Sequence, residues 1–599
     1  MGFYIKEGVF MRKKSVRRRS KRSRMPYIPA PILIGTVVIA LILIIVLGII
    51  LFNKFSPSKE HISLNDYYKM TSDTQVAITL DNQVLTTYGT LIDGQVYLDY
   101  QFVHDSLNSR FYWDANENIL LYTTANHVIS AKADENRYYL GKSSADYERV
   151  IVKASADSAW IDIDFVKKYT NIEYSYYDTP ARVVITSNWT DITTSTLRGK
   201  TELRLEADIK SPILVTAKKG DTLTILETDK KWTKVCSSDG VVGFVQSPKV
   251  KRTQTQTLTS DFTPDTFAHI EMGEPINLLW HQVLNTTANS KISTILTDSK
   301  GVNVICPTWF KLKDNNGNIS SLASADYVEY CHSHDVKVWG LVKNFDLDSD
   351  EIDINYILTH TSVRQRLVNQ LIAQALQYNL DGINVDFETL SYSEIGDAYI
   401  QFLRELSIKC ENNDIVLSTS VPPSNQFNNA YQYEEQTDFV DYVALMAYDQ
   451  HYGQQSGEGS VAALDWVEDG VQTLLQKGIP SDQLVLGIPF YTRLWTLTPT
   501  TEDDDIDAPY LISRENKGLT SGKTWMEENV EDPVWLDDCK QWYGEKQRNG
   551  VIYKMWLEDE NSLAERLKLL DKYELAGAAF WRSGLENKEA WDLIIKYIN

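Results

Sequence analysis

The sequence predicts a multidomain protein whose C-terminal part is an α/β barrel of the (β/α)8 type with an inserted α+β subdomain. Smaller modules, one β-rich and one α+β, are expected to precede it. Three observations lead to this prediction. The chain of 599 residues is too long for one hydrophobic core. Residues 60–190 contain an internal repeat, and residues 266–599 alternate apolar strand-like runs with helical patterns.

The chain begins with a basic tail and an apolar segment. Residues 1–26 hold ten Lys and Arg against one acid, Glu7, which gives them a formal charge of +9. The formal charge of the whole chain is −22, so the rest of the chain carries −31. Residues 32–52 contain no charge, and about 21 residues of helix span the roughly 30 Å of a bilayer core. We therefore expect a cytoplasmic tail at 1–27, a transmembrane helix at 28–52 and an extracytoplasmic remainder. A cleaved signal peptide is the alternative, although no small-x-small cleavage site follows.

Residues 60–190 form the predicted repeat module. Residues 96–123 are similar to residues 159–186, with Leu98/Ile161, Asp99/Asp162, Phe102/Phe165 and Val103/Val166 at a constant offset. Each copy predicts a strand, a short helix, a strand, a turn and a strand. The module resembles copper-amine-oxidase N-terminal-like domains of bacterial surface proteins, which implies a spacer or a wall-binding role. It shows no cluster of copper ligands.

Residues 195–250 predict short strands separated by turns. Gly220–Asp221 and Asp239–Gly240 are turn pairs between strands. Together with Trp232 and Phe244, they give this stretch a resemblance to bacterial SH3 domains. The resemblance implies contact with the cell wall, and a passive small barrel is the alternative. The polar residues 251–266 are expected to be a linker.

Eight apolar runs follow the linker, with helical patterns between most of them. The segment 362–380, for example, is an amphipathic helix that leads directly into the fourth run. About 85 residues separate the seventh and eighth runs, which is too long for one crossover and predicts the inserted subdomain. The eight predicted strands are 276–283, 302–310, 337–344, 382–388, 414–421, 442–449, 484–491 and 577–584.

The fourth run alternates apolar and polar residues. Side chains alternate between the two faces of a strand, so Ile383 and Val385 are expected to face the helices. Asn384, Asp386 and Glu388 are then expected to face the barrel axis, with Glu388 nearest the C-terminal mouth, where such barrels place active sites. Carboxylates pointing into a barrel are costly unless they are paired or used. A structural buried polar pair is the alternative.

Four motifs resemble those of the family 18 glycoside hydrolases, the chitinase-like family. "DGINVDFE" (381–388) resembles the DGxDxDxE signature, "MAYD" (446–449) a motif of strand six, "LGIPFYTRLW" (486–495) a motif of strand seven, and "AFWRSG" (579–584) a motif of strand eight. The resemblance covers residues 266–599. Asn384 departs from the pattern, because many members have Asp there. We expect its amide to donate a hydrogen bond to Asp386.

The resemblance implies a substrate-assisted mechanism. Glu388 would be the general acid and then the base, and Asp386 would hold the N–H of the 2-acetamido group of the sugar. Tyr448 would donate a hydrogen bond to the acetamido oxygen, with an ordinary tyrosine at the barrel mouth as the alternative. The expected sugar-binding residues are Asn384, Met446, Asp449, Tyr491, Arg493 and Trp581, although Trp581 would otherwise be read as core packing.

The sequence therefore predicts a membrane-anchored retaining glycosidase that acts on N-acetylated β-1,4 glycans, with peptidoglycan favoured. Chitin and host N-glycans remain alternatives, as do a non-catalytic glycan-binding protein on the same barrel and an envelope-assembly factor. The acidic body excludes nucleic acid as a partner. The five scattered cysteines and "CHSHD" (331–335) predict neither a disulfide framework nor a metal site, and no cofactor is expected.

Overall fold

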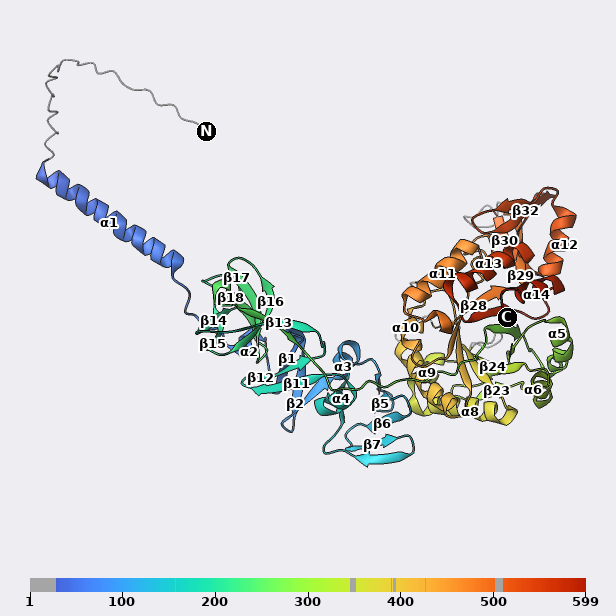
Figure 1. Cartoon of the computed structure of the whole chain (residues 1–599), viewed down its shortest axis with the longest axis horizontal. Coiled ribbons are helices and arrows are strands. Elements are labelled where there is room, and N and C mark those ends of the chain that lie inside the picture. The colour runs from blue at the N-terminus through green and yellow to red at the C-terminus, as the bar shows by residue number, and fades with distance from the viewer. Residues whose placement is uncertain are drawn as a thin grey trace, which may run out of the picture. The chain divides into compact units, whose positions relative to one another are not determined.

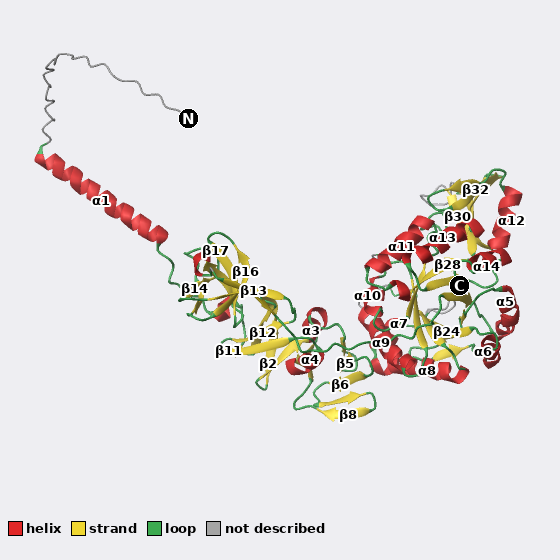
Figure 2. Cartoon of the chain, viewed as in Figure 1, coloured by secondary structure: helices red, strands yellow, loops and turns green. Residues whose placement is uncertain are grey.

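The computed structural model describes residues 29–156, 158–250, 252–344, 352–388, 390, 395–425, 427–500 and 510–598 (Figures 1 and 2). The predicted basic tail, 1–27, lies outside the described residues. The chain divides into two compact units. The first comprises residues up to 70, 82–84 and 191–257, and the second comprises 71–81, 85–190 and 258–599.

The first unit begins with one long apolar helix, α1 (Ala30–Phe55), labelled in Figure 1. An 18-residue stretch of the helix reaches a mean hydropathy of 3.3, and none of its 26 residues is buried. The helix is long and apolar enough to cross a membrane, and a signal sequence near the N-terminus would satisfy the same criteria.

The remainder of the first unit is a seven-stranded sheet in the order β15-β14-β18-β17-β16-β13-β19. Gly220 and Gly240 both adopt positive φ, at 97° and 84°, in the turns between strands that the sequence indicated. The bacterial SH3 resemblance itself stays a prediction. The strands are β13 (Asp191–Thr196), β14 (Thr201–Arg204), β15 (Ile213–Ala217), β16 (Thr222–Thr228), β17 (Trp232–Ser237), β18 (Val242–Gln246) and β19 (Thr253–Thr257), and a short helix, α2 (Leu64–Tyr67), precedes them.

The two repeat copies have the same order of elements. The first contains β3 (Gln95–Asp99), α3 (Tyr100–Ser106), β4 (Phe111–Asp114) and β5 (Ile119–Thr123), and the second contains β10 (Ala159–Asp162), α4 (Ile163–Tyr169), β11 (Glu173–Asp178) and β12 (Ala181–Thr186). Asp99 and Asp162 each cap the helix that follows, and Leu98 pairs with Ile161 across antiparallel strands. The equivalent residues of the repeat therefore take equivalent places in the fold.

The strands of the module fall into two sheets. One has the order β11-β12-β1-β2-β3-β10-β9, and the other is β4-β5-β6-β7-β8. The remaining strands are β1 (Gln75–Leu80), β2 (Gln83–Ile92), β6 (Val128–Lys132), β7 (Arg137–Leu140), β8 (Ser143–Asp146) and β9 (Val152–Ala154).

The hairpin of β4 and β5 packs on the barrel that follows. Tyr112 and Leu121 belong to the same apolar cluster as the barrel helices. The buried Asp114 accepts a hydrogen bond of 2.6 Å from the backbone N–H of Thr361, the first residue of helix α8 (Thr361–Tyr378). Because His360 provides no side-chain cap, the module supplies the acceptor that this helix terminus needs.

The barrel consists of eight parallel strands, and the pairing of β21 with β24 closes it. The order is β20-β34-β28-β27-β26-β25-β24-β21, and all eight predicted runs are confirmed. A short hairpin of β22 (Phe310–Leu312) and β23 (Ile319–Ser321) extends beside β24. The barrel strands are β20 (Ile276–His281), β21 (Val304–Pro307), β24 (Lys337–Lys343), β25 (Gly382–Asp386), β26 (Val416–Val421), β27 (Tyr442–Met446), β28 (Leu484–Pro489) and β34 (Gly577–Trp581).

Helices surround the strands, as Figure 2 shows. The helices are α5 (Ile292–Asp298), α6 (Ala325–His332), α7 (Ile354–Thr359), α8, α9 (Gly396–Glu411), α10 (Tyr433–Gln436), α11 (Leu464–Gln476), α13 (Glu560–Tyr573) and α14 (Lys588–Ile594).

Two apolar clusters divide the faces of the barrel strands. Ile383, Val385 and Phe387 are fully buried in the large cluster that includes the helices. The smaller cluster contains residues from the opposite face of the other strands, such as Leu278, Trp280 and Cys306. The fourth strand contributes no side chain to it, because its residues of that parity are Gly382, Asn384 and Asp386. The inward orientation expected for Asn384 and Asp386 is therefore the observed one.

The predicted insertion lies between β28 and α13. A five-stranded sheet in the order β30-β29-β33-β32-β31 carries one helix, α12 (Leu519–Asn529). Met526 of this helix packs with Leu494, Met555 and Leu557 of the sheet. The strands are β29 (Tyr491–Pro499), β30 (Tyr510–Gly518), β31 (Val534–Leu536), β32 (Gln541–Arg548) and β33 (Val551–Leu557).

Candidate active site

The fourth strand begins with a glycine for a steric reason. A Cβ atom on Gly382 would lie 2.4 Å from the ring of Trp339. The indole of Trp339 fills the barrel interior at this level, so only glycine fits beneath it. The polar residues of β25 thus lie above a closed apolar layer.

Asn384 is fully buried and is held by the neighbouring strand β26. Its Nδ2 donates to Ser418 Oγ at 2.9 Å, and its Oδ1 accepts from Ser420 Oγ at 2.9 Å. Ser418 lies opposite Asn384 in the register of the two parallel strands. The prediction that the Asn384 amide donates a hydrogen bond to Asp386 was wrong, because the amide is hydrogen-bonded to Ser418 and Ser420 instead.

Asp386 follows on the same face and is 7% exposed. Its Oδ1 atom is buried and has no hydrogen-bond partner among the described residues. Burial, and then the charge of Glu388, raises the pKa of Asp386 well above its ordinary value. The inner carboxyl is therefore an unused hydrogen-bonding group inside the barrel.

Glu388 lies two residues beyond the end of β25 and is half-buried. The side chain of Asn344, which follows β24, makes two hydrogen bonds with its backbone. Asn344 Oδ1 accepts from the N–H of Glu388 at 2.9 Å, and Asn344 Nδ2 donates to its carbonyl at 2.7 Å. Burial raises the pKa of the Glu388 carboxyl, and the charge of Asp449 raises it further. A carboxyl in this environment keeps its proton to higher pH than an exposed one.

Tyr448 and Asp449 follow strand β27. The ring centroid of Tyr448 lies 6.5 Å from that of Trp280 and 6.5 Å from that of Tyr491. Burial raises the pKa of the Tyr448 hydroxyl well above its ordinary value, as do the neighbouring Tyr491 and Asp386. The hydroxyl therefore remains a hydrogen-bond donor at any physiological pH.

The carboxylate of Asp449 joins two of the predicted sugar contacts. Arg493 Nη2 donates to Asp449 Oδ1 at 2.6 Å, and the Tyr491 hydroxyl donates to the same oxygen. A second nitrogen of Arg493 donates to the carbonyl of His451. Arg493 is 3% exposed, whereas the side chain of Asp449 is 48% exposed. The buried guanidinium therefore fixes a carboxylate that remains open to solvent.

Aromatic rings line the ends of the first and last strands. Trp581, the half-buried last residue of β34, lies 6.0 Å from Trp280, the two rings meeting edge to face. Met446, the last residue of β27, is half-buried opposite Gly487. One connected group of side chains thus contains Trp280, Tyr448, Tyr491, Asp449 and Arg493. The charges of Asp386 and Glu388 raise the pKa of Tyr448, and the charge of Asp449 raises the pKa of Glu388, so the group is linked to both carboxyls.

Sequence reasoning missed two residues of this region, Trp280 and Asn344. Trp280 stands near the end of the first strand at a position whose side chain faces the barrel axis, and this alternation could have identified it from the sequence. Asn344 ends the third predicted run, but its contact with Glu388 depends on the loop geometry. Among the described residues, no group of three His, Cys, Asp or Glu side chains is arranged to hold a metal ion.

The chain is similar to known proteins at low sequence identity. The chain is 25% identical to the uncharacterized glycosylase YvbX of Bacillus subtilis (strain 168) over 295 residues, 47% of this chain and 81% of YvbX. It is 26% identical to the cortical fragment-lytic enzyme of the same organism over 263 residues, 42% of this chain and 57% of that enzyme. It therefore spans little more than half of the latter's length.

Among solved structures, the spore cortex-lytic enzyme SleL of Bacillus cereus aligns at 17% identity with a TM-score of 0.48. The alignment covers 57% of this chain and 78% of SleL. The family model described as "Glycosyl hydrolases family 18" matches residues 286–586, half of the chain. With its closed eight-stranded parallel barrel, the chain belongs to the glycosyl hydrolases family 18.

Proposed function

We propose that the protein hydrolyses the β-1,4 bond on the reducing side of a 2-acetamido sugar and retains the anomeric configuration. The observation that carries the proposal is the pairing of two unlike carboxyl groups at one barrel mouth. Asp386 is buried with an unpartnered oxygen, and Glu388 is half-buried with a raised pKa. The first can receive a hydrogen bond from the substrate, and the second can give a proton.

The first step breaks the glycosidic bond. Glu388 transfers its proton to the leaving oxygen while the acetamido oxygen of the substrate attacks the anomeric carbon. The bond from carbon to the leaving oxygen breaks, and a bond to the acetamido oxygen forms, which gives a cyclic oxazolinium ion. Asp386 accepts the acetamido N–H and offsets the positive charge that develops beside it. The hydroxyl of Tyr448 donates to the acetamido oxygen and orients it for attack.

The second step releases the product. The ionised Glu388 takes a proton from a water molecule, whose oxygen attacks the anomeric carbon from the face that the leaving group vacated. The bond to the acetamido oxygen breaks, and the sugar leaves with its original configuration. Burial and mutual repulsion disfavour double ionisation of Asp386 and Glu388, so the pair is suited to holding one proton in the free enzyme, which Glu388 delivers in the first step and regains in the second.

The remaining residues position the sugar. Asp449, held by Tyr491 and Arg493, offers a fixed carboxylate to sugar hydroxyl groups. Trp581 offers its ring as the floor under the cleaved sugar, and Trp280 supports that ring. Asn384 acts through β26, where it fixes the strand next to Asp386. Met446 is proposed as a minor apolar contact.

Peptidoglycan is the proposed natural substrate, with chitin-like chains as the alternative. The support comes from the apolar helix α1, from the resemblance of residues 195–250 to wall-associated SH3 domains, and from the similarity to a cortical fragment-lytic enzyme. We further propose that α1 anchors the protein in the cell membrane with the barrel outside. Wall-directed activity and anchoring are compatible, because a tethered enzyme works on the wall that surrounds the membrane.

The test compares the full chain, solubilised in a mild detergent, with Glu388→Gln on purified peptidoglycan sacculi and on tetra-N-acetylchitotetraose. General acids contribute on the order of 10²–10⁴-fold, so the variant should lose at least about 99% of turnover while keeping its melting temperature. Glu411→Gln, at the end of α9 that leads to the opposite end of the barrel, is the matched control and should keep full activity. Wild-type binding without any cleavage would favour the non-catalytic alternative.

A further inference from the structure

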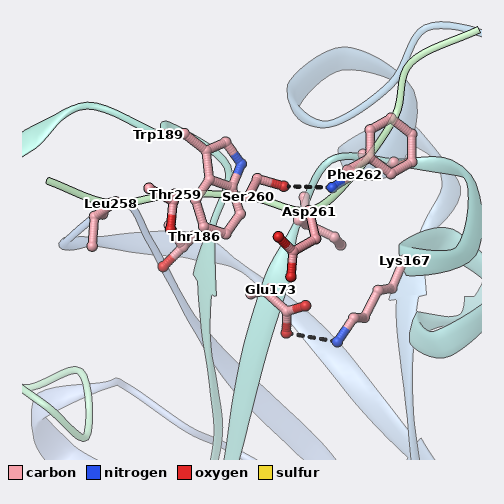
Figure 3. Close-up of a pocket in the computed structure, with 11 residues that line it drawn as sticks. Lys167, Glu173, Thr186, Trp189, Leu258, Thr259, Ser260, Asp261 and Phe262 are labelled. Carbon is pink, nitrogen blue, oxygen red and sulfur yellow. Dashed lines mark hydrogen bonds and ion pairs between the residues drawn. The ribbon is translucent and has the colours of Figure 1, made fainter.

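A cavity lies outside the barrel, between the repeat module and the linker that follows residue 257. Its volume is about 420 Å³. The module contributes Lys167, Glu173 and Trp189, and the linker contributes residues 258–262 (Figure 3). All of these residues belong to the same compact unit. We call this cavity the Trp189 pocket.

Hydrogen bonds to one residue, Asn171, hold two sides of the pocket in place. The indole Nε1 of Trp189 donates to the carbonyl of Asn171 at 2.9 Å, and Ser260 Oγ donates to Asn171 Oδ1 at 2.5 Å. Ser260 Oγ in turn accepts from the backbone N–H of Phe262 at 3.1 Å, which Figure 3 marks with a dashed line. The linker is thus attached to the module at the pocket, and a wall fixed in advance lowers the cost of binding.

The polar groups of the pocket favour a neutral ligand that donates hydrogen bonds. Lys167 and Glu173 form an ion pair of 2.6 Å, and Asp261 is exposed with no hydrogen bond or ion pair among the described residues. Figure 3 shows Asp261 between Trp189 and the Lys167–Glu173 pair. Two carboxylates against one ammonium group repel phosphates and acidic chains. Carboxylates accept bonds from hydroxyl and amide N–H groups, and a half-buried indole covers an apolar ring face.

We propose that the Trp189 pocket is an accessory binding site for the neutral 2-acetamido sugar units of the glycan that the barrel cleaves. The choice of ligand class rests on the proposed function. The pyranose ring packs on Trp189, and Asp261 accepts the acetamido N–H or a hydroxyl group. The volume is within the range of sites for small molecules, about 300–1,000 Å³. A second site on the same chain keeps an insoluble glycan near the barrel through effective concentration.

The direct test follows Trp189 itself. The full chain with Glu388→Gln is labelled with 5-fluorotryptophan, the fluorine signal of Trp189 is assigned with Trp189→Phe, and tetra-N-acetylchitotetraose is added. The Trp189 signal should shift and saturate. In Asp261→Ala, the concentration for half-saturation should rise about tenfold, as expected when a contact central to binding is removed. A Trp189 signal that stays in place while signals from barrel tryptophans move would overturn the proposal.

A functional test separates this proposal from the proposed function. Trp189→Ala and Asp261→Ala are made in the otherwise unmodified enzyme, with Tyr176→Ala as the control, an exposed aromatic residue on the same strand as Glu173 that does not line the pocket. Cleavage of the soluble tetramer should stay unchanged in all three variants, whereas cleavage of insoluble chitin should fall several-fold in the first two only. Equal cleavage of chitin by all three would refute the accessory site. Absence of cleavage by the wild type would refute the proposed function alone, since the fluorine signal still reports binding.

Discussion

Replacing Asn344 with alanine should impair catalysis more than binding. The two hydrogen bonds of Asn344, 2.9 and 2.7 Å long, fix the backbone of Glu388 just beyond the end of β25. Each such bond contributes about 0.5–1.5 kcal/mol net, so their loss amounts to about 1–3 kcal/mol. If most of this energy holds the acid over the glycosidic oxygen, kcat falls by about 10- to 100-fold, because about 1.4 kcal/mol corresponds to a factor of ten.

The assay is steady-state hydrolysis of tetra-N-acetylchitotetraose by the full chain across a range of pH. For Asn344→Ala we expect a lower kcat, a KM within about threefold of the wild type, and an altered alkaline limb, because a displaced Glu388 changes its burial and its distance from Asp449. Asn344→Asp keeps the acceptor for the N–H of Glu388 but loses the donor, so it should recover only part of kcat.

The matched control is Asn277→Ala. Asn277 is buried like Asn344, and its Nδ2 donates to the carbonyl of Gly301 at 2.9 Å, but it lies at the start of β20, at the opposite end of the barrel. Its loss should lower stability and leave kcat per folded molecule unchanged. If Asn344→Ala behaved in the same way, with an unchanged pH profile, the role of Asn344 in positioning the acid would be refuted.

Three other predictions concern the charge at the mouth, the docked module and the membrane. Asp449→Asn removes a negative charge that raises the pKa of Glu388, so the alkaline limb of kcat should move to lower pH, and an unmoved limb would show that this charge is not felt. Asp114→Ala removes the buried acceptor of the Thr361 N–H and should cost about 1–2 kcal/mol in the free energy of unfolding, measured by urea denaturation; no change would mean that the module does not stabilise helix α8. Protease added to intact cells should degrade the chain beyond residue 60, whereas a main form released into the medium without α1 would indicate cleavage.

The barrel could be predicted because each strand carries its own local signal. The alternation along 382–388 decided which side chains face inward, and the eight runs appear as eight parallel strands. The order of elements in both repeat copies also followed from local patterns, and the capping aspartates Asp99 and Asp162 mark where their helices begin. These features require no knowledge of contacts between distant residues.

The partners of the polar side chains could not be predicted, because they depend on register and on loop geometry. Asn384 bonds to Ser418 and Ser420 because parallel pairing places β26 beside it, and nothing in the fourth run indicates that register. The two bonds between Asn344 and Glu388 join residues 44 positions apart. The cap that Asp114 provides joins the module to a barrel helix 247 positions away. Each contact exists only after the tertiary structure has formed.

The most direct test of the central claim follows the configuration of the first product in the presence of two competing substrates. The full chain is given tetra-N-acetylchitotetraose and its de-N-acetylated counterpart in one tube, and the anomeric protons are recorded by ¹H NMR from the first minutes. Substrate-assisted catalysis predicts that only the N-acetylated tetramer is cleaved and that its new reducing end appears first as the β anomer. Initial formation of the α anomer, or cleavage of the free-amine tetramer at a comparable rate, would contradict the mechanism proposed for Asp386 and Glu388.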